Sequence, residues 1–215
     1  GLFFYGIERH RLQGTELEVA KSELQKYEGD VGRAEREKLK LQSKLGRAEV
    51  NLKDNRERFS QYAEEADDLK KKLASVVGGD RSDVRVLEDR IILQIADTAL
   101  FGGKGSAKLS KEGKRALDQI GEMLVEMRER DVQVEGHTSD KPVGEVAKGF
   151  DTNWEFAAAR ATAVVRHFHD EVGIEPERLS STSHAEYQPV SRTSKAKNRR
   201  IDIALLPKAL HRIGD

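Results

Sequence analysis

The stretch VEGHTSDKPVGEVAKGFDTNWEFAAARATAVVR, from Val134 to Arg166, decides how the chain folds. It starts in a short apolar strand that ends at Gly136, passes through a polar loop to Asp151, and then enters a helix. We expect a capping box at the start of this helix, because Thr152 can accept the backbone N–H of Glu155 and the Glu155 side chain can reach back. A strand, a loop and a capped helix N-terminus form a corner at which an anion can bind.

Two polar side chains of this helix are spaced to point the same way. Asn153 and Arg160 lie seven residues apart, which is two helical turns. We expect them beside an apolar stripe made by Trp154, Ala158, Ala161, Val165 and Phe168. Asp140 of the loop can approach the same corner. A guanidinium, a carboxylate and backbone N–H groups together suit a ligand that carries both an amine and a carboxylate, although an arginine on a helix is most often only a solvated flank.

The segments around this stretch predict a sheet with helices packed on it. Apolar runs predict a first strand from Val84 to Ile95 and later strands over 179–183 and 201–205. A helix is expected from Lys111 to Arg128 with Ser110 as its N-cap, and a short helical turn near 195–199. Strands joined through helices indicate an α/β fold, an α+β sandwich of one sheet with helices on it.

Residues 15–77 keep the heptad pattern of a coiled coil. With Leu17 at position a, the a and d positions are apolar or aromatic except at Lys38 and Asn55, and such polar residues commonly fix the register. At about 1.5 Å per residue this helix is roughly 90 Å long. Because an apolar seam needs a partner, we expect a homo-oligomer, with a dimer favoured; a different chain or an antiparallel copy stays open. The seam residues are Leu17, Ala20, Leu24, Tyr27, Val31, Ala34, Leu41, Leu45, Ala48, Leu52, Phe59, Tyr62, Ala66, Leu69, Leu73 and Val76.

The composition excludes several classes of function. The 215 residues are 35% charged and 37% hydrophobic, which is too polar for a single globule. Lys plus Arg and Asp plus Glu number 38 each, and no basic stripe indicates nucleic-acid binding. The absence of Cys excludes a disulfide framework, a thiol nucleophile and a thiolate metal site, and is compatible with the periplasm.

The N-terminal segment is apolar but short. No apolar run reaches the length of about 18 residues that a membrane-spanning helix needs. The segment GLFFYGI is followed at once by the charged stretch from Glu8 to Arg11. We interpret residues 1–14 as the stub of a membrane helix, with a disordered or tag-derived end as the equally weighted alternative.

Four segments, in the same order, resemble the OmpA-like peptidoglycan-binding domain in its MotB-like variety, which occurs in motor stators: GHTSDKP, NWEFAAARATAVVRHF, GIEPERL and EYQPVSRTSKAKNRRIDIAL. Upstream, RIILQIADTALFGGKGSAKLSKEGKRALDQI resembles the opening strand and Phe-x-x-Gly turn of this family. The resemblance covers about residues 85–206 and implies the element order β-α-β-α-β-β. This chain departs from the family pattern at Ser139, where the family has Asp, with Asp140 next to it. It departs again at Phe156-Ala157, which replace Leu-Ser, and at 183–185, which replace Gly-x-Gly.

The resemblance implies a noncovalent anchor on peptidoglycan, with no catalysis and no cofactor. The bound group would be the diaminopimelate of the stem peptide. We expect Arg160 on its carboxylate and Thr138 and Asp140, with backbone N–H groups, around its amine. Three further residues would shape the wall of the pocket: Phe101, Asn153 and Arg199.

The resemblance also implies a place for the protein. We expect it in the periplasm, anchored to the inner membrane by a segment absent from this chain, with a membrane channel as a partner if it serves an ion-driven stator. A passive envelope tether is the alternative use. A coiled-coil scaffold that has lost ligand binding is a third, which Ser139 makes credible.

Other kinds of site find little support in the sequence. Four histidines are candidates for zinc ligands: His137, His167, His169 and His184. His167 and His169 lie two residues apart on a helix and do not share a face, so we expect no metal site. The glycine-rich turn over 101–106 lacks the residue order of a phosphate loop. No Gly-x-Ser-x-Gly motif or carboxylate pair in an apolar setting indicates a hydrolase.

The predicted organisation follows from these assignments. Residues 1–14 are the membrane-helix stub and 15–77 the coiled coil. The glycine-containing stretch 78–83 is a linker. Residues 84–207 form the OmpA-like domain, and 208–215 are a C-terminal tail.

Overall fold

The protein is described by a computed structural model that covers residues 2–87, 89–103, 105–145, 147 and 149–208. Contacts divide the chain into two units, Gly1–Arg56 and Glu57–Asp215, and each is described by itself. Helix α1 (Leu2–Val77) supplies all of the first unit that is described and the start of the second. The predicted tail lies outside the described residues beyond Lys208.

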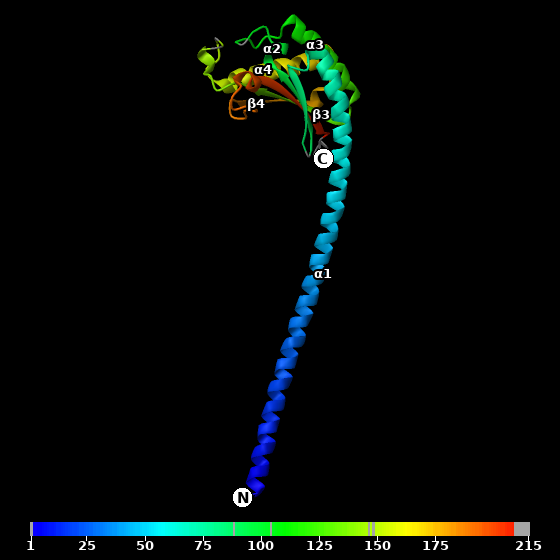
Figure 1. Cartoon of the computed structure of the whole chain (residues 1–215), viewed down its shortest axis with the longest axis vertical. Helices are drawn as coiled ribbons and strands as arrows, with labels where there is room; N and C mark the ends of the chain where they lie inside the picture. The colour runs from blue at the N-terminus through cyan, green and yellow to red at the C-terminus, as the bar shows by residue number, and fades with distance from the viewer. Residues whose placement is uncertain (1, 88, 104, 146, 148, 209–215) are drawn as a thin grey trace, which may run out of the picture. The chain divides into compact units, whose positions relative to one another are not determined.

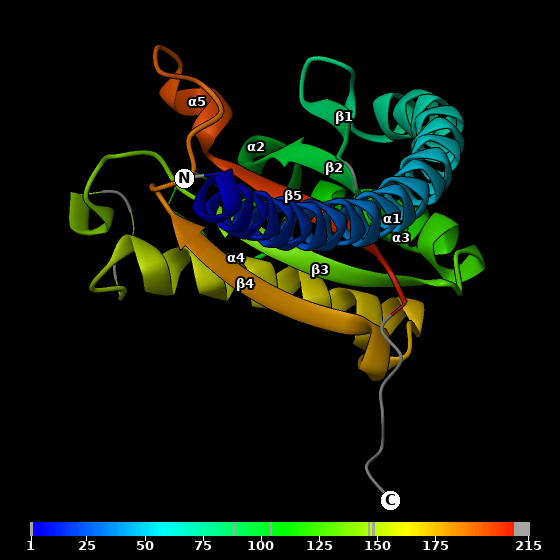
Figure 2. The same cartoon turned by 90° about the horizontal axis from the view of Figure 1, so that it is seen from below.

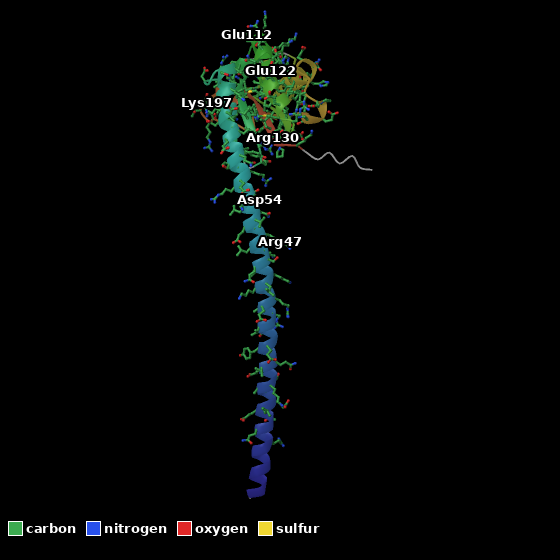
Figure 3. All side chains as sticks on the ribbon, turned by 90° about the vertical axis from the view of Figure 1, so that its right-hand side faces the viewer. Arg47, Asp54, Glu112, Glu122, Arg130 and Lys197 are labelled. Carbon is green, nitrogen blue, oxygen red and sulfur yellow. The ribbon has the colours of Figure 1, made fainter. Side chains whose placement is uncertain are left out.

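In the first unit, α1 carries its apolar seam on the surface. Leu17 is 56% exposed and Leu52 is 71% exposed. Figure 3 shows the side chains of this part of the helix standing out around it. The long helix predicted from the heptads is confirmed. Over the described residues, no helix combines the length and the hydropathy that crossing a membrane requires.

The last turns of α1 belong to the second unit and are buried in its core. The buried residues are Tyr62, Ala66, Leu69, Leu73 and Val77. Arg130 fixes this segment, since its guanidinium lies 4.2 Å from the centre of the Tyr62 ring and pairs with Glu65 at 2.7 Å (Figure 3). The heptad pattern predicted all but Val77 of these residues in a seam between chains, whereas they are buried within their own chain.

The second unit is built on a five-stranded sheet in the order β1-β2-β5-β3-β4, which can be followed across Figure 2. Strands β3 and β4 are parallel and the other neighbours are antiparallel. The single first strand predicted over 84–95 is instead a hairpin of two strands, because Leu87 donates its N–H to the Arg90 carbonyl and the chain turns back there. The strands are β1 (Ser82–Val86), β2 (Ile91–Ala96), β3 (Arg130–His137), β4 (Leu179–Ala185) and β5 (Arg200–Pro207).

Helices α3, α4 and α5 lie where the sequence predicted them, and the short helix α2 was not predicted. Ser110 caps α3 by accepting the Gly113 N–H, and Gly173 ends the α4 segment in the left-handed conformation, at φ 83°. Counted from β2, the main elements follow the order β-α-β-α-β-β, which confirms the expected fold. Strand β1 is an additional edge strand (Figure 2). Figure 1 shows α3 and α4 together with β3 and β4. The helical segments are α2 (Asp97–Leu100), α3 (Lys111–Glu126), α4 (Asn153–His167), a π-helical turn (Phe168–Val172) and α5 (Lys195–Asn198), with 3-10 turns at Val143–Glu145 and Pro176–Arg178.

The two faces of the sheet differ in chemistry. Side chains that alternate along β2, β3 and β5 form the apolar core with α3, α4 and the end of α1: Ile91, Leu93, Ile95, Val132, Val134, Ile201, Ile203 and Leu205. Gly136 lets α4 approach β3, because a Cβ there would lie 2.1 Å from the Ala157 carbonyl oxygen. The residues between these point to the opposite face, which is polar: Gln94, Gln133, Glu135, His137 and Asp202.

Candidate functional site

The N-terminus of α4 has the predicted capping box. Thr152 is the N-cap and its hydroxyl accepts the Glu155 N–H. The Glu155 carboxylate accepts the N–H groups of Thr152 at 2.8 Å and Asp151 at 2.9 Å. These backbone hydrogen bonds hold the pKa of Glu155 below its usual value, and the bond from Thr152 has the largest effect. The cap thus already engages three of the N–H groups that were expected to face a ligand.

Arg160 lies inside the domain, 1% exposed. Its Nε donates to the Ser106 carbonyl at 2.9 Å, Nη1 to Asp97 Oδ2 at 3.1 Å, and Nη2 to the Gly103 carbonyl at 3.1 Å. The guanidinium carbon is 4.7 Å from the centre of the Phe101 ring and 4.3 Å from that of Phe156. Burial lowers the pKa of Arg160, while the Asp97 carboxylate opposes that shift.

The buried face of α4 matches the predicted stripe only in part: Ala161 and Phe168 are buried as expected, whereas Trp154 is not. Trp154 is 48% exposed and stacks on Tyr187 at 5.5 Å. The residues that face inward are Phe156, Ala157, Arg160, Ala161 and Val164. The helix turns this way because Phe156 packs with the loop before it, which is not a plain polar loop: Val143, Ala147 and Phe156 form a second small core, and the Phe150 and Phe156 rings lie 5.2 Å apart.

Asp97 is the functional candidate that the sequence analysis missed. It is 3% exposed at the carboxyl end of β2 and pairs with Arg160. Arg199 Nε lies 3.4 Å from the same Asp97 oxygen. Three of the predicted site residues, Phe101, Arg160 and Arg199, are therefore grouped around one buried carboxylate. The sequence signal that could have identified Asp97 is its position directly after the apolar strand β2.

The other predicted residues gather at the loop after β3. Asn153 Nδ2 donates to the Lys141 carbonyl at 3.1 Å and to the Ser139 carbonyl at 3.4 Å. Thr138 is buried, and its Oγ1 has no hydrogen-bond partner among the described residues. Asp140 is on the surface and pairs with Lys195 at 2.9 Å, and this hydrogen-bonded ion pair lowers the pKa of Asp140. Asp140 and Arg160 thus have different partners here, Lys195 and Asp97.

The four histidines separate into different settings. His167 Nε2 lies 2.7 Å from Asp118 Oδ1, and His169 is exposed. His137 and His184 stack on the polar face of the sheet, with ring centres 5.0 Å apart. Burial lowers the pKa of His137, although the Asp202 carboxylate opposes this shift. Glu135 Oε2 lies 3.9 Å from His137 Nε2 and 3.3 Å from His184 Nε2, a proximity that the sequence did not indicate.

The sequence is similar to known proteins along most of its length. The OmpA family model matches residues 103–202. An uncharacterized protein of Bacillus subtilis (strain 168) named YtxE is 25% identical over 198 residues, which covers 87% of this chain and 78% of that protein. Motility protein B of the same organism is 25% identical over 130 residues, which covers 59% of this chain and 49% of that protein.

The fold is similar to solved structures of MotB-like domains. A putative MotB-like protein from Desulfovibrio vulgaris is 25% identical with a TM-score of 0.63, covering 74% of this chain and 98% of that one. The cell wall anchor of the T6SS from Pseudomonas aeruginosa is 26% identical with a TM-score of 0.57, covering 65% and 97%. The periplasmic domain of Helicobacter pylori MotB is 24% identical with a TM-score of 0.56, covering 61% and 82%, and shows the shared fold. Residues 103–202 of this chain therefore match the OmpA family, and the domain that contains them is similar to MotB-like domains.

Proposed function

We propose that this protein is a noncovalent anchor that holds a membrane-rooted complex to peptidoglycan. The main support for this proposal is the similarity to a solved structure described as a cell wall anchor. The similarity covers 97% of that chain at 26% sequence identity. The placement of Phe101, Arg160 and Arg199 around Asp97 adds a fixed cation and an aromatic wall in one part of the domain. We propose no catalytic step.

The proposed ligand is the diaminopimelate of the stem peptide, bound at the corner between β3 and α4. Thr138 and Asp140 would contact its amine, because Thr138 Oγ1 lacks a partner among the described residues and Asp140 is a surface carboxylate. Asn153, Phe101 and Arg199 would shape the wall. Asn153 supports this role by tying the 139–141 loop to the start of α4.

Arg160 would bind the ligand carboxylate. For this to happen, the carboxylate must replace the Ser106 or the Gly103 carbonyl, each of which now accepts one N–H of the guanidinium. Such an exchange is favourable, since a hydrogen bond from a guanidinium to a carboxylate is roughly twice as strong as one to a neutral group. The Asp97 contact stays and keeps the guanidinium in position.

The test uses the full chain and a muropeptide that contains diaminopimelate, measured by isothermal titration. Asp140→Asn is the informative variant, because the side chain is exposed and its loss leaves the core intact. We expect it to weaken binding by about tenfold, the effect of a charge-assisted contact of roughly 1.4 kcal/mol.

Lys195→Ala is the matched control. It breaks the same ion pair and leaves the Asp140 carboxylate in place, so binding should be retained. Equal binding by Asp140→Asn and the wild-type protein would remove the role proposed for this carboxylate. Arg160→Ala, checked for folding, should abolish binding.

We further propose that the anchor serves an ion-driven motor stator in the periplasm, rooted in the inner membrane beside a channel-forming partner. The similarity to Motility protein B supports this, over about half of that protein's length. Deletion in the source bacterium should abolish swimming while leaving flagellar filaments assembled. Normal swimming with a weakened envelope would instead favour the passive tether.

A further inference from the structure

Two histidines and a carboxylate meet on the polar face of the sheet, at the end of β3 that leads into the loop of the proposed ligand corner. His184 Nε2 lies 3.3 Å from Glu135 Oε2, and His137 Nε2 lies 3.9 Å from the same oxygen. One ligand-type atom from each of these residues lies within 4.8 Å of the other two. Strands β3 and β4 supply them, so rigid backbone holds the group together.

The cluster is buried more deeply than a chance surface group. His137 is 2% exposed and Glu135 is 9% exposed. Among the described residues, His137 Nδ1 has no hydrogen-bond partner, while Nε2 lies 3.3 Å from Asp202 Oδ2 without a well-aligned hydrogen bond. An unpaired polar atom at such depth costs about 1–3 kcal/mol, and therefore calls for a partner.

The spacing fits a tetrahedral metal ion. Zinc bonds to imidazole nitrogen and carboxylate oxygen of about 2.0–2.2 Å place neighbouring ligand atoms roughly 3.4 Å apart. The two printed separations to Glu135 Oε2, 3.3 and 3.9 Å, lie close to that value. We propose that His137 Nε2, His184 Nε2 and Glu135 Oε2 form a zinc site with one open position.

The surrounding charges are compatible with a dication. Asp202 Oδ2 lies 3.3 Å from His137 Nε2 and adds a second negative charge beside the site. Arg200 and Gln94 hold that carboxylate, with Arg200 Nε donating to Asp202 Oδ1 at 2.9 Å. Arg200 offsets part of this negative charge, and Arg85 and Arg90 act on the same group of charges. His184 is partly exposed and provides a route for the ion to enter.

The test is zinc binding by the untagged full chain after chelator treatment, followed by titration with zinc chloride and by thermal unfolding. The wild-type protein should bind one zinc ion and gain thermal stability. His184→Ala should weaken that binding by at least about tenfold, the loss caused by removing even an outer partner of a metal ligand. Glu135→Gln, which keeps the shape of the side chain, should weaken it similarly.

His169→Ala is the matched control, since it removes a histidine that is exposed and outside the cluster. It should bind zinc as the wild-type protein does. Absence of zinc binding by the wild-type chain would overturn the proposal, as would equal affinity of His184→Ala and wild type. Neither result decides muropeptide binding, which is measured with a different probe and different variants.

Discussion

At the scale of single residues, Asp97 and Arg160 are the pair on which the interior of the domain depends. Both side chains are almost completely buried, and the distance between Arg160 Nη1 and Asp97 Oδ2 is 3.1 Å. Removing one member of a buried pair leaves the other charge uncompensated, at a cost of about 3–5 kcal/mol. The pair therefore matters for stability whether or not a ligand is bound.

Asp97→Ala should reduce the free energy of unfolding by about 3–5 kcal/mol, measured by urea denaturation. Asp68→Asn is the control, because its ion pair with Lys72 is exposed on both sides and should contribute little. The double variant Asp97→Asn with Arg160→Met should recover part of the loss, since the Arg160 guanidinium is no longer buried without its carboxylate partner. A small effect of Asp97→Ala, like that of the control, would contradict this account.

The sequence predicted the secondary-structure elements that carry the site residues better than it predicted the contacts of their side chains. The spacing of Asn153 and Arg160 was enough to place both on α4, but not to show that Arg160 points into the core. Its partner Asp97 is 63 residues away in the chain, so local periodicity carries no information about the pair. Asp140 was expected at the same corner, and its contact with Lys195 depends on α5, whose position no local pattern predicts.

At the scale of elements, the capping box at the start of α4 makes stability depend on pH. The ionised Glu155 side chain accepts two backbone N–H groups, so its pKa in the folded protein is below that of the unfolded chain. Its stabilising contribution is present above the unfolded pKa and is lost as the pH falls through the folded pKa.

Glu155→Gln should therefore be less stable than the wild-type protein near neutral pH, and the difference should narrow as the solution is acidified from about pH 7 to pH 3. Urea denaturation at a series of pH values measures this. Thr152→Ala provides the comparison: it removes the acceptor of the Glu155 N–H, at a cost of about 1 kcal/mol, but leaves two backbone N–H groups on the Glu155 carboxylate, so most of the pH dependence of stability should remain. A gap between Glu155→Gln and wild type that does not change with pH would rule out the carboxylate as its source.

The seam of α1 in the first unit should bring chains together. We propose a dimer, because large apolar side chains repeat at heptad spacing and are exposed in the described helix, as at Leu24 and Leu45, each 60% exposed. Leu45→Lys should shift the full chain to a monomer in sedimentation equilibrium. Leu39→Lys is the control, since Leu39 is similarly exposed but lies outside the a and d positions, and it should remain dimeric. A monomeric wild-type chain would refute the proposed seam.

The heptad periodicity predicted α1, but it could not show at which residue the apolar face of the helix begins to pack against its own domain. Leu69 and Leu73 continue the heptads without interruption, yet they pack against the core of their own domain. Heptad spacing records only that one helix face is apolar, and both a second helix and a sheet with its helices can bury such a face. The first strand was misjudged for a related reason, since the run from Val84 to Ile95 contains a turn at Leu87 to Arg90.

At the scale of the whole molecule, two sequence signals describe two units with separate tasks. The heptads predict a helix for association, and the strand, loop and helix of the opening stretch predict a domain for binding. The family resemblance supplied the fold correctly, and the comparisons with known proteins agree with it. What local patterns could not supply was the polar face of the sheet, because Glu135, His137 and His184 come together only when β3 and β4 pair in parallel.

The most direct test of the account is co-sedimentation of the full chain with purified sacculi that contain diaminopimelate. The account predicts that the protein pellets with the sacculi and returns to the supernatant when soluble muropeptide is added in excess. Protein that stays in the supernatant without competitor, while remaining folded, would contradict the claim that this chain is a cell wall anchor.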